Sequence, residues 1–146
     1  MKTTLSYNTK FKNQIVTITE DLQTLIKKNK IKNGTLIAYS LHTTLGLTIQ
    51  ESIEPNLCQD IFDQLTQIVD DDGAKYHHTC SDNPHKICKT DDVNGPSHVR
   101  QLLTNQNIVL DVKDGKLNIG TFQDIAVLEF DGPRNNRQVL VKIIED

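Results

Sequence analysis

The sequence predicts an α+β protein: a single domain over residues 1–146, built on a mainly antiparallel β-sheet with helices packed on one of its faces. Three observations lead to this prediction. Helical periodicity is confined to three segments, short runs rich in Val, Ile and Thr fill much of the rest, and the links between the later runs are short, which favours antiparallel pairing. A chain of 146 residues is also long enough to bury a core of its own.

The first half of the chain contains four runs that read as strands, because β-branched residues suit a pleated, half-buried surface. They are Thr3–Tyr7, Ile15–Thr19, Gly34–Leu41 and Leu45–Gln50.

Three segments are predicted to be helical. Residues 20–30 repeat apolar side chains at helical spacing, with acidic residues at the start and lysines at the end, as the helix dipole favours. A second helix begins at Pro55, which costs nothing in a first turn, and continues along one apolar face to about residue 69. Gly95–Leu103 is a third, short helix.

The second half is rich in strands. They are Ile108–Val112, Lys116–Gly120, Ile125–Phe130 and Val139–Ile144. Asp114-Gly115 between the first two is a hairpin turn signal, because glycine tolerates the positive φ that such a turn requires.

Residues 70–93 lack any apolar period and form a long predicted loop. Loops of this length inside a compact domain are uncommon and usually functional or disordered, and the concentration of histidine and cysteine here favours function. The role of 79–93 is left open. The segment 70–93 contains His77, His78, Cys80, His85 and Cys88.

Composition limits the partners and the location. The net charge is −3 and there is no Trp, so we expect neither a nucleic-acid partner nor a membrane partner. No apolar run reaches the length of a membrane span, and the first residues do not resemble a signal peptide. Three cysteines are an odd number, which argues against a disulfide framework. We therefore expect a cytoplasmic protein.

His42, His78 and His98 are candidates for a shared metal or anion site. Imidazole is a common ligand of zinc, and three protein ligands leave a fourth position for water or substrate, so the expected cofactor is a divalent metal such as zinc. The spacing matches no compact metal motif, and convergence must come from the fold. The simpler interpretation, histidines that are only hydrogen-bonded or solvated, stays open.

Other polar residues near these histidines suit a small phosphorylated substrate. Thr43 and Thr44 offer hydroxyls, and Arg134 offers a guanidinium fork. Glu51 ends its strand and suits a general acid or base. Each also has a structural interpretation, as a strand former or a surface charge. The glycine-rich nucleotide loops and the G-x-S-x-G elbow are absent from the sequence.

Four stretches, taken in order, resemble the YjbQ-like family. They are HTTLGLTIQE at 42–51, YHH at 76–78, NGPSHV at 94–99 and GKLNIGTFQDIAVLEFDGPR at 115–134. Members of that family are described as secondary thiamine-phosphate synthases, and the resemblance spans roughly residues 35–145.

The family pattern transfers to this sequence residue by residue. Phe122 stands where the family usually has Trp, and Asp124 where Gly or a basic residue is common, so we expect a pocket of different shape and charge. The matching positions are His42, Thr43, Thr44, Glu51, His78, His98, Gly120, Thr121 and Gln123.

The resemblance implies a homotrimer that couples a pyrimidine-methyl pyrophosphate to a thiazole phosphate and releases pyrophosphate. The three histidines would hold a divalent ion or the anion directly, Thr43, Thr44 and Arg134 would contact phosphate, and Glu51 would orient water or a ligand. Two alternatives stay open. One is a metal-dependent hydrolase of a small phosphorylated or carbonyl substrate, and the other is a non-catalytic trimer that binds a small molecule or a metal.

Overall fold

A computed structural model describes residues 1–78 and 93–146. Residues 79–92, which contain Cys80, His85 and Cys88, lie outside the described residues. The role of the loop 79–93 therefore stays open. The strands are β1 (Lys2–Tyr7), β2 (Gln14–Thr17), β3 (Gly34–Ser40), β4 (Leu45–Gln50), β5 (Asn107–Lys113), β6 (Lys116–Leu117), β7 (Asp124–Glu129) and β8 (Arg137–Glu145). The helices are α1 (Thr19–Lys28), α2 (Pro55–Ile68) and α3 (Gly95–Leu102), with a short 3₁₀ turn at Gly73–Lys75.

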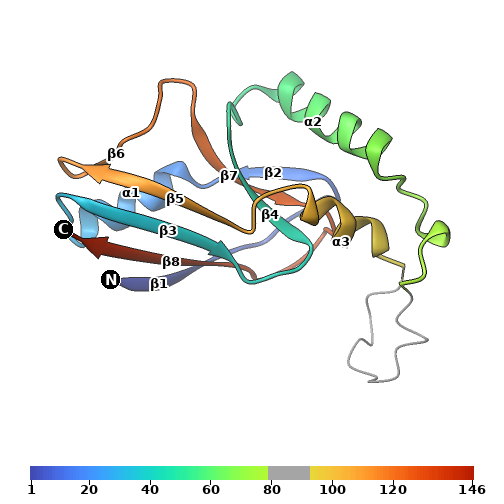
Figure 1. Ribbon diagram of the computed structural model, residues 1–146, viewed down its shortest axis with the longest axis horizontal. Coiled ribbons are helices and arrows are strands. Elements are labelled where there is room, and N and C mark those ends of the chain that lie inside the picture. Colours follow the sequence, from blue (N-terminus) through green and yellow to red (C-terminus); the bar gives the residue numbers. More distant parts are fainter. Residues whose placement is uncertain (79–92) are drawn as a thin grey trace.

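The strands form two antiparallel sheets. The large sheet has the order β1-β8-β3-β5-β6, and the small sheet has the order β2-β7-β4. Figure 1 shows the long strands of the large sheet beside the small sheet, with α2 and α3 toward the other end of the molecule. The predicted α+β class with antiparallel pairing is confirmed.

The main core lies between the two sheets and α1. In β5, Ile108, Leu110 and Val112 are buried and alternate with exposed residues, as expected for a strand with one face on a core. Leu22 and Ile26 of α1 are fully buried in the same cluster. Their removal from water supplies the main favourable term in folding.

The helices do not share one face, which corrects the sequence prediction. β7 is apolar on both sides. Ile125 and Val127 of this strand face the main core. Leu128 of the strand and Phe130, which follows its last residue, join a second cluster with Phe62 of α2. Each apolar face of the small sheet needs its own cover. α1 and the large sheet therefore cover one face, and α2 covers the other.

Element boundaries follow the sequence predictions closely, with one exception. The strand predicted at Lys116–Gly120 is paired only over Lys116–Leu117. The hairpin turn before it is confirmed, because Asp114 and Gly115 have φ of 52° and 79°.

The register of β4 against β7 decides where the candidate site residues lie. Leu45 pairs with Glu129 at one end, and Gln50 pairs with Asp124 at the other. Residues 42–44 and 131–137 therefore belong to one end of the strand pair.

Among the described residues, no helix is long and apolar enough to cross a membrane.

Candidate functional site

A pocket of about 390 Å³ lies at the end of β4 and β7, beside the start of α3. It is built from the β3–β4 loop, the first turn of α3 and the segment between β7 and β8. Five of the predicted site residues meet here: His42, Thr43, Thr44, His98 and Arg134. Its other lining residues are Leu41, Asn94, Asp131, Asn135 and Arg137.

A buried ion pair joins Arg137, one of the lining residues of this pocket, to Glu129. Glu129 at the end of β7 is 0% exposed, and Arg137 at the start of β8 is 5% exposed. Arg137 Nε donates to Glu129 Oε2 at 2.5 Å, and Nη2 donates to Oε1. Such two-point contact fixes the plane of the guanidinium as well as its position. Thr44 Oγ1 accepts from the same Nη2 at 2.8 Å, so the hydroxyl oxygen of this predicted residue is used to hold Arg137.

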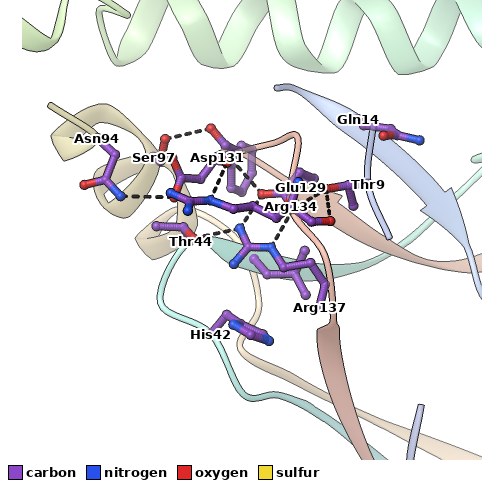
Figure 2. A network of polar contacts seen from close by, with 12 residues as sticks. Thr9, Gln14, His42, Thr44, Asn94, Ser97, Glu129, Asp131, Arg134 and Arg137 are labelled. Carbon is purple, nitrogen blue, oxygen red and sulfur yellow. Dashed lines mark hydrogen bonds and ion pairs between the residues drawn. The ribbon is translucent and has the colours of Figure 1, made fainter. Parts of the chain in front are cut away.

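Glu129 also holds the chain around it. Its Oε2 accepts from Thr9 Oγ1 at 2.9 Å, and its Oε1 accepts from the backbone N–H of Asp131 at 2.8 Å. The backbone N–H of Arg134 in turn donates to Thr9 Oγ1 at 3.0 Å. A buried carboxylate needs several donors of this kind. The pair therefore sets the course of the segment between β7 and β8 (Figure 2).

Arg134 is the more exposed of the two pocket arginines. Its side chain is 31% exposed, and its Nη2 donates to Asp131 Oδ2 at 2.8 Å while Nε donates to the Asp131 carbonyl at 3.0 Å. Asn94 Nδ2 donates to the same Oδ2 at 3.0 Å. Asp131 therefore aims a guanidinium at the pocket and ties it to the start of α3.

His42 is held by the backbone of β8. Its Nε2 accepts from the N–H of Gln138 at 2.8 Å, and its carbonyl accepts from Gln106 Nε2 at 3.2 Å. Partial burial lowers the pKa of His42, and the nearby Arg137 lowers it further, with Glu129 acting in the opposite direction. The fold therefore favours a neutral imidazole at this position.

His98 links the pocket to the segment at 76–78. It lies in the first turn of α3, and its ring meets the ring of His78 edge to face, with centroids 4.8 Å apart. Close packing brings the two segments together, because a Cβ on Gly95 would come within 2.7 Å of Tyr76 Cβ. The structure thus brings His98 into ring contact with His78, and His98 lines the same pocket as His42.

Two buried polar side chains anchor α3. Ser97 Oγ donates to the Phe130 carbonyl at 2.6 Å. Arg100, 0% exposed, donates from Nη2 to the Val69 carbonyl at 3.0 Å and lies 3.2 Å from Asp71 Oδ1. These contacts hold α3 against the end of β7 and against the chain that follows α2.

The described residues do not fit a three-histidine metal centre. Within residues 1–78 and 93–146, no group of three His, Cys, Asp or Glu side chains is placed to hold a metal. The Nε2 lone pair of His42 is already occupied by the Gln138 N–H. The divalent metal, zinc or another, stays a prediction that this geometry does not support.

The remaining predicted residues lie elsewhere. Gly120 and Gln123 close a turn, since the Gly120 N–H donates to Gln123 Oε1 at 2.8 Å, and Thr121 lies inside this turn. The turn precedes Asp124, which pairs with Gln50, the residue before Glu51. Five residues of strand, about 17 Å, separate this end of β4–β7 from the pocket end. Within one chain, the pocket therefore does not include Glu51, Gly120, Thr121 or Gln123.

Sequence reasoning missed Glu129, Asp131, Asn94 and Arg137. A signal for Glu129 was present, because a carboxylate inside the apolar run IAVLEF is buried and must be paired. Its partner could not be read from the sequence. The pairing depends on where β8 begins relative to β7.

Removal of either member of the buried pair should destabilise the protein strongly. We expect Glu129→Gln and Arg137→Met each to lower the free energy of unfolding by about 3–5 kcal/mol, because the remaining group loses its main partner. The double variant should cost about 1–3 kcal/mol less than the sum, as measured by urea denaturation. The exposed Lys75–Asp70 pair is the control and should show a smaller coupling. Additive losses at Glu129 and Arg137 would contradict this account.

Stability should fall in mild acid because of His42. Its folded-state pKa is below the usual value near 6.5, so the unfolded chain binds the proton first as the pH drops. The contribution of neutral His42 to the free energy of unfolding is complete above about pH 6.5 and is lost as the pH falls below that value. Urea denaturation at about pH 7.5 and about pH 5.5 should show a smaller loss for His42→Gln than for the wild type. Equal losses would show that His42 does not titrate in this way.

Comparison with known proteins gives a consistent family. The family model described as "UPF0047 protein YjbQ-like" matches residues 3–146. A UPF0047 protein of Methanocaldococcus jannaschii is 32% identical over 91% of this chain and 86% of its own length, and one of Archaeoglobus fulgidus is 33% identical over 90% and 91%.

Solved structures agree. A hypothetical protein of Aeropyrum pernix has a TM-score of 0.85 at 25% identity, covering 100% of this chain and 99% of its own. A YjbQ/UPF0047 family protein of Clostridium acetobutylicum has a TM-score of 0.80 at 29% identity, covering 97% and 99%. Sequence and structure together place this chain in the UPF0047 (YjbQ-like) family.

Proposed function

We propose that the pocket binds a small phosphorylated molecule through direct contacts with protein donors. The observation that carries this proposal is the side chain of Arg134, 31% exposed at the pocket and oriented by Asp131. A guanidinium held in a fixed plane suits phosphate oxygens. Thr43, which is exposed, and His42 line the same pocket and supply a hydroxyl and an imidazole ring.

The volume supports a ligand of modest size. About 390 Å³ lies near the lower end of the range of small-molecule sites. Arg137 contributes mainly by shaping the wall, because its charge is already matched by Glu129. Arg134 is therefore the residue whose loss should affect affinity most directly.

The proposed reaction is the coupling of a pyrimidine-methyl pyrophosphate with a thiazole phosphate, as the resemblance implies. Breaking the bond at the pyrimidine methylene leaves negative charge on the departing pyrophosphate. Preorganised donors aimed at that charge are the physical means of stabilising it. Arg134 and Thr43 would bind the pyrophosphate, with His42 and His98 beside the reacting centre.

We also propose that the protein is a homotrimer. On the outer face of the large sheet, Tyr39, Val109 and Ile144 are 40%, 62% and 48% exposed, on three neighbouring strands. Strand alternation directs them away from the main core, which contains Leu36 and Ile143. Exposed apolar side chains gathered on one sheet face favour an interface there, with the exposed Lys142 of β8 on the same face.

Loss of Arg134 should weaken pyrophosphate binding. Calorimetric titration with pyrophosphate should give a Kd at least about tenfold higher for Arg134→Gln, because a charge-assisted contact is removed. Lys32→Gln is the matched control. It removes an exposed positive charge that is not part of this pocket. Equal weakening in both variants would indicate only a general charge effect.

The coupling reaction itself is tested by supplying both thiamine precursors and measuring thiamine phosphate and released pyrophosphate. Product formed by the wild type and lost in Arg134→Gln would support the proposed enzyme. Pyrophosphate binding without product would leave a binding protein. Turnover of a panel of phosphoesters, without coupling, would favour a hydrolase.

The assembly is tested by sedimentation velocity. We expect the wild type to sediment with the mass of three chains and Val109→Lys to sediment as one chain, because a charge would be buried in the interface. Leu102→Lys, a substitution at an apolar α3 residue that is 77% exposed, is the control and should leave the mass unchanged. A monomeric wild type would overturn the trimer.

A further inference from the structure

We infer that His42 serves the pocket as a neutral hydrogen-bond donor through Nδ1–H, and not as a metal ligand or a general base. The inference rests on the proposed function for the identity of the ligand, an oxyanion such as phosphate. The protonation state of the ring does not depend on the proposed function. That state follows from the contacts of His42 and from the charges around its ring.

The first step concerns Nε2. The backbone N–H of Gln138 can only donate, and it lies 2.8 Å from His42 Nε2. Nε2 must therefore present its lone pair and cannot carry a proton. A neutral imidazole has one N–H and one bare nitrogen, so the proton is on Nδ1.

The second step concerns the charge of the ring. Protonation of both nitrogens would place an N–H on Nε2 directly against the N–H of Gln138. The charged groups that act on the ring are Arg137 at the start of β8 and Glu129 at the end of β7, and these two are paired with each other. His98 and the paired Arg134 and Asp131 line the same pocket. The surroundings therefore resist a second positive charge, and the ring stays neutral.

The third step concerns orientation. The β3–β4 loop is fixed beneath the ring, because Gln106 Nε2 donates to the carbonyls of Ser40 at 2.6 Å and His42 at 3.2 Å. The Nε2 edge of the imidazole rests on β8, while the ring lines the pocket. Within the described part of the chain, Nδ1 has no hydrogen-bond partner. It is the ring nitrogen left for a ligand.

The chemical consequence is a choice of ligand atom. An N–H needs an acceptor, so Nδ1 suits a phosphate or carbonyl oxygen and repels a cation. Metal ligation by His42 would require it either to lose the Gln138 contact or to become an imidazolate. A base would need a bare nitrogen facing the substrate, and the bare nitrogen is already used.

Two substitutions at this position separate the two edges of the ring. Glutamine can place its side-chain oxygen near the position of Nε2, where it accepts from Gln138, but it has no group at Nδ1. Asparagine can place its NH₂ near Nδ1, but it does not reach the Gln138 N–H. The two substitutions therefore remove the donor at Nδ1 and the acceptor at Nε2 one at a time.

We expect His42→Gln to unfold near the wild-type temperature and to bind pyrophosphate about tenfold more weakly, because a hydrogen bond to a charged group is lost. His42→Asn should unfold at a lower temperature and keep more of the affinity. Retention of full affinity by His42→Gln would overturn the inference.

The protonation of each ring nitrogen of His42 is measured by histidine nitrogen NMR on the intact protein, and the signals are assigned by comparison with the His42→Gln spectrum. We expect a protonated Nδ1 and a bare Nε2 at neutral pH, unchanged when zinc is added. A proton on Nε2, or a His42 shift on zinc addition, would overturn the inference. Failure of the wild type to bind pyrophosphate would instead overturn the proposed function and leave the NMR result to decide the state of His42.

Discussion

The buried pair of Glu129 and Arg137 is the interaction on which the candidate site depends. In a medium of low polarity, two charges remain only when each is matched and fully hydrogen-bonded. Here the carboxylate accepts from Arg137, Thr9 and the backbone of Asp131, so one group joins the ends of β7 and β8 to the chain after β1. An apolar replacement could stabilise the fold equally well. It would not fix the directions of the surrounding donors.

The same pair explains why the pocket relies on the direction of its donors more than on net charge. Glu129 neutralises Arg137, and Asp131 largely offsets Arg134. His42 adds an N–H without adding charge. A pocket of this type can recognise a phosphate group by the placement of N–H and O–H groups around it, in a protein whose overall charge is −3.

Much of the fold could be predicted from the sequence, because strand alternation and helix signals are local. The part of the site around His42 and His98 was also accessible, since these residues stand at element ends. The buried partners were not. Glu129 reads as a polar break in an apolar strand, and only the three-dimensional packing shows that Arg137, eight residues later, returns to pair with it. Local patterns likewise did not reveal that β7 is covered on both faces.

The β4–β7 register has the further consequence of dividing the residues that the sequence pattern groups together. His42 and Arg134 lie at the Leu45–Glu129 end, whereas Glu51 and Gln123 lie at the Gln50–Asp124 end. A rigid strand pair cannot bend to join them, because its length is fixed by the rise of about 3.3 Å per residue. Either the second group acts separately, for example by shaping the turn that Gln123 closes, or it meets the pocket of a neighbouring chain. The second arrangement makes assembly a condition for a complete site. A mixture of two variants that each bind pyrophosphate weakly, one altered at each end, would then regain binding only if their subunits exchange.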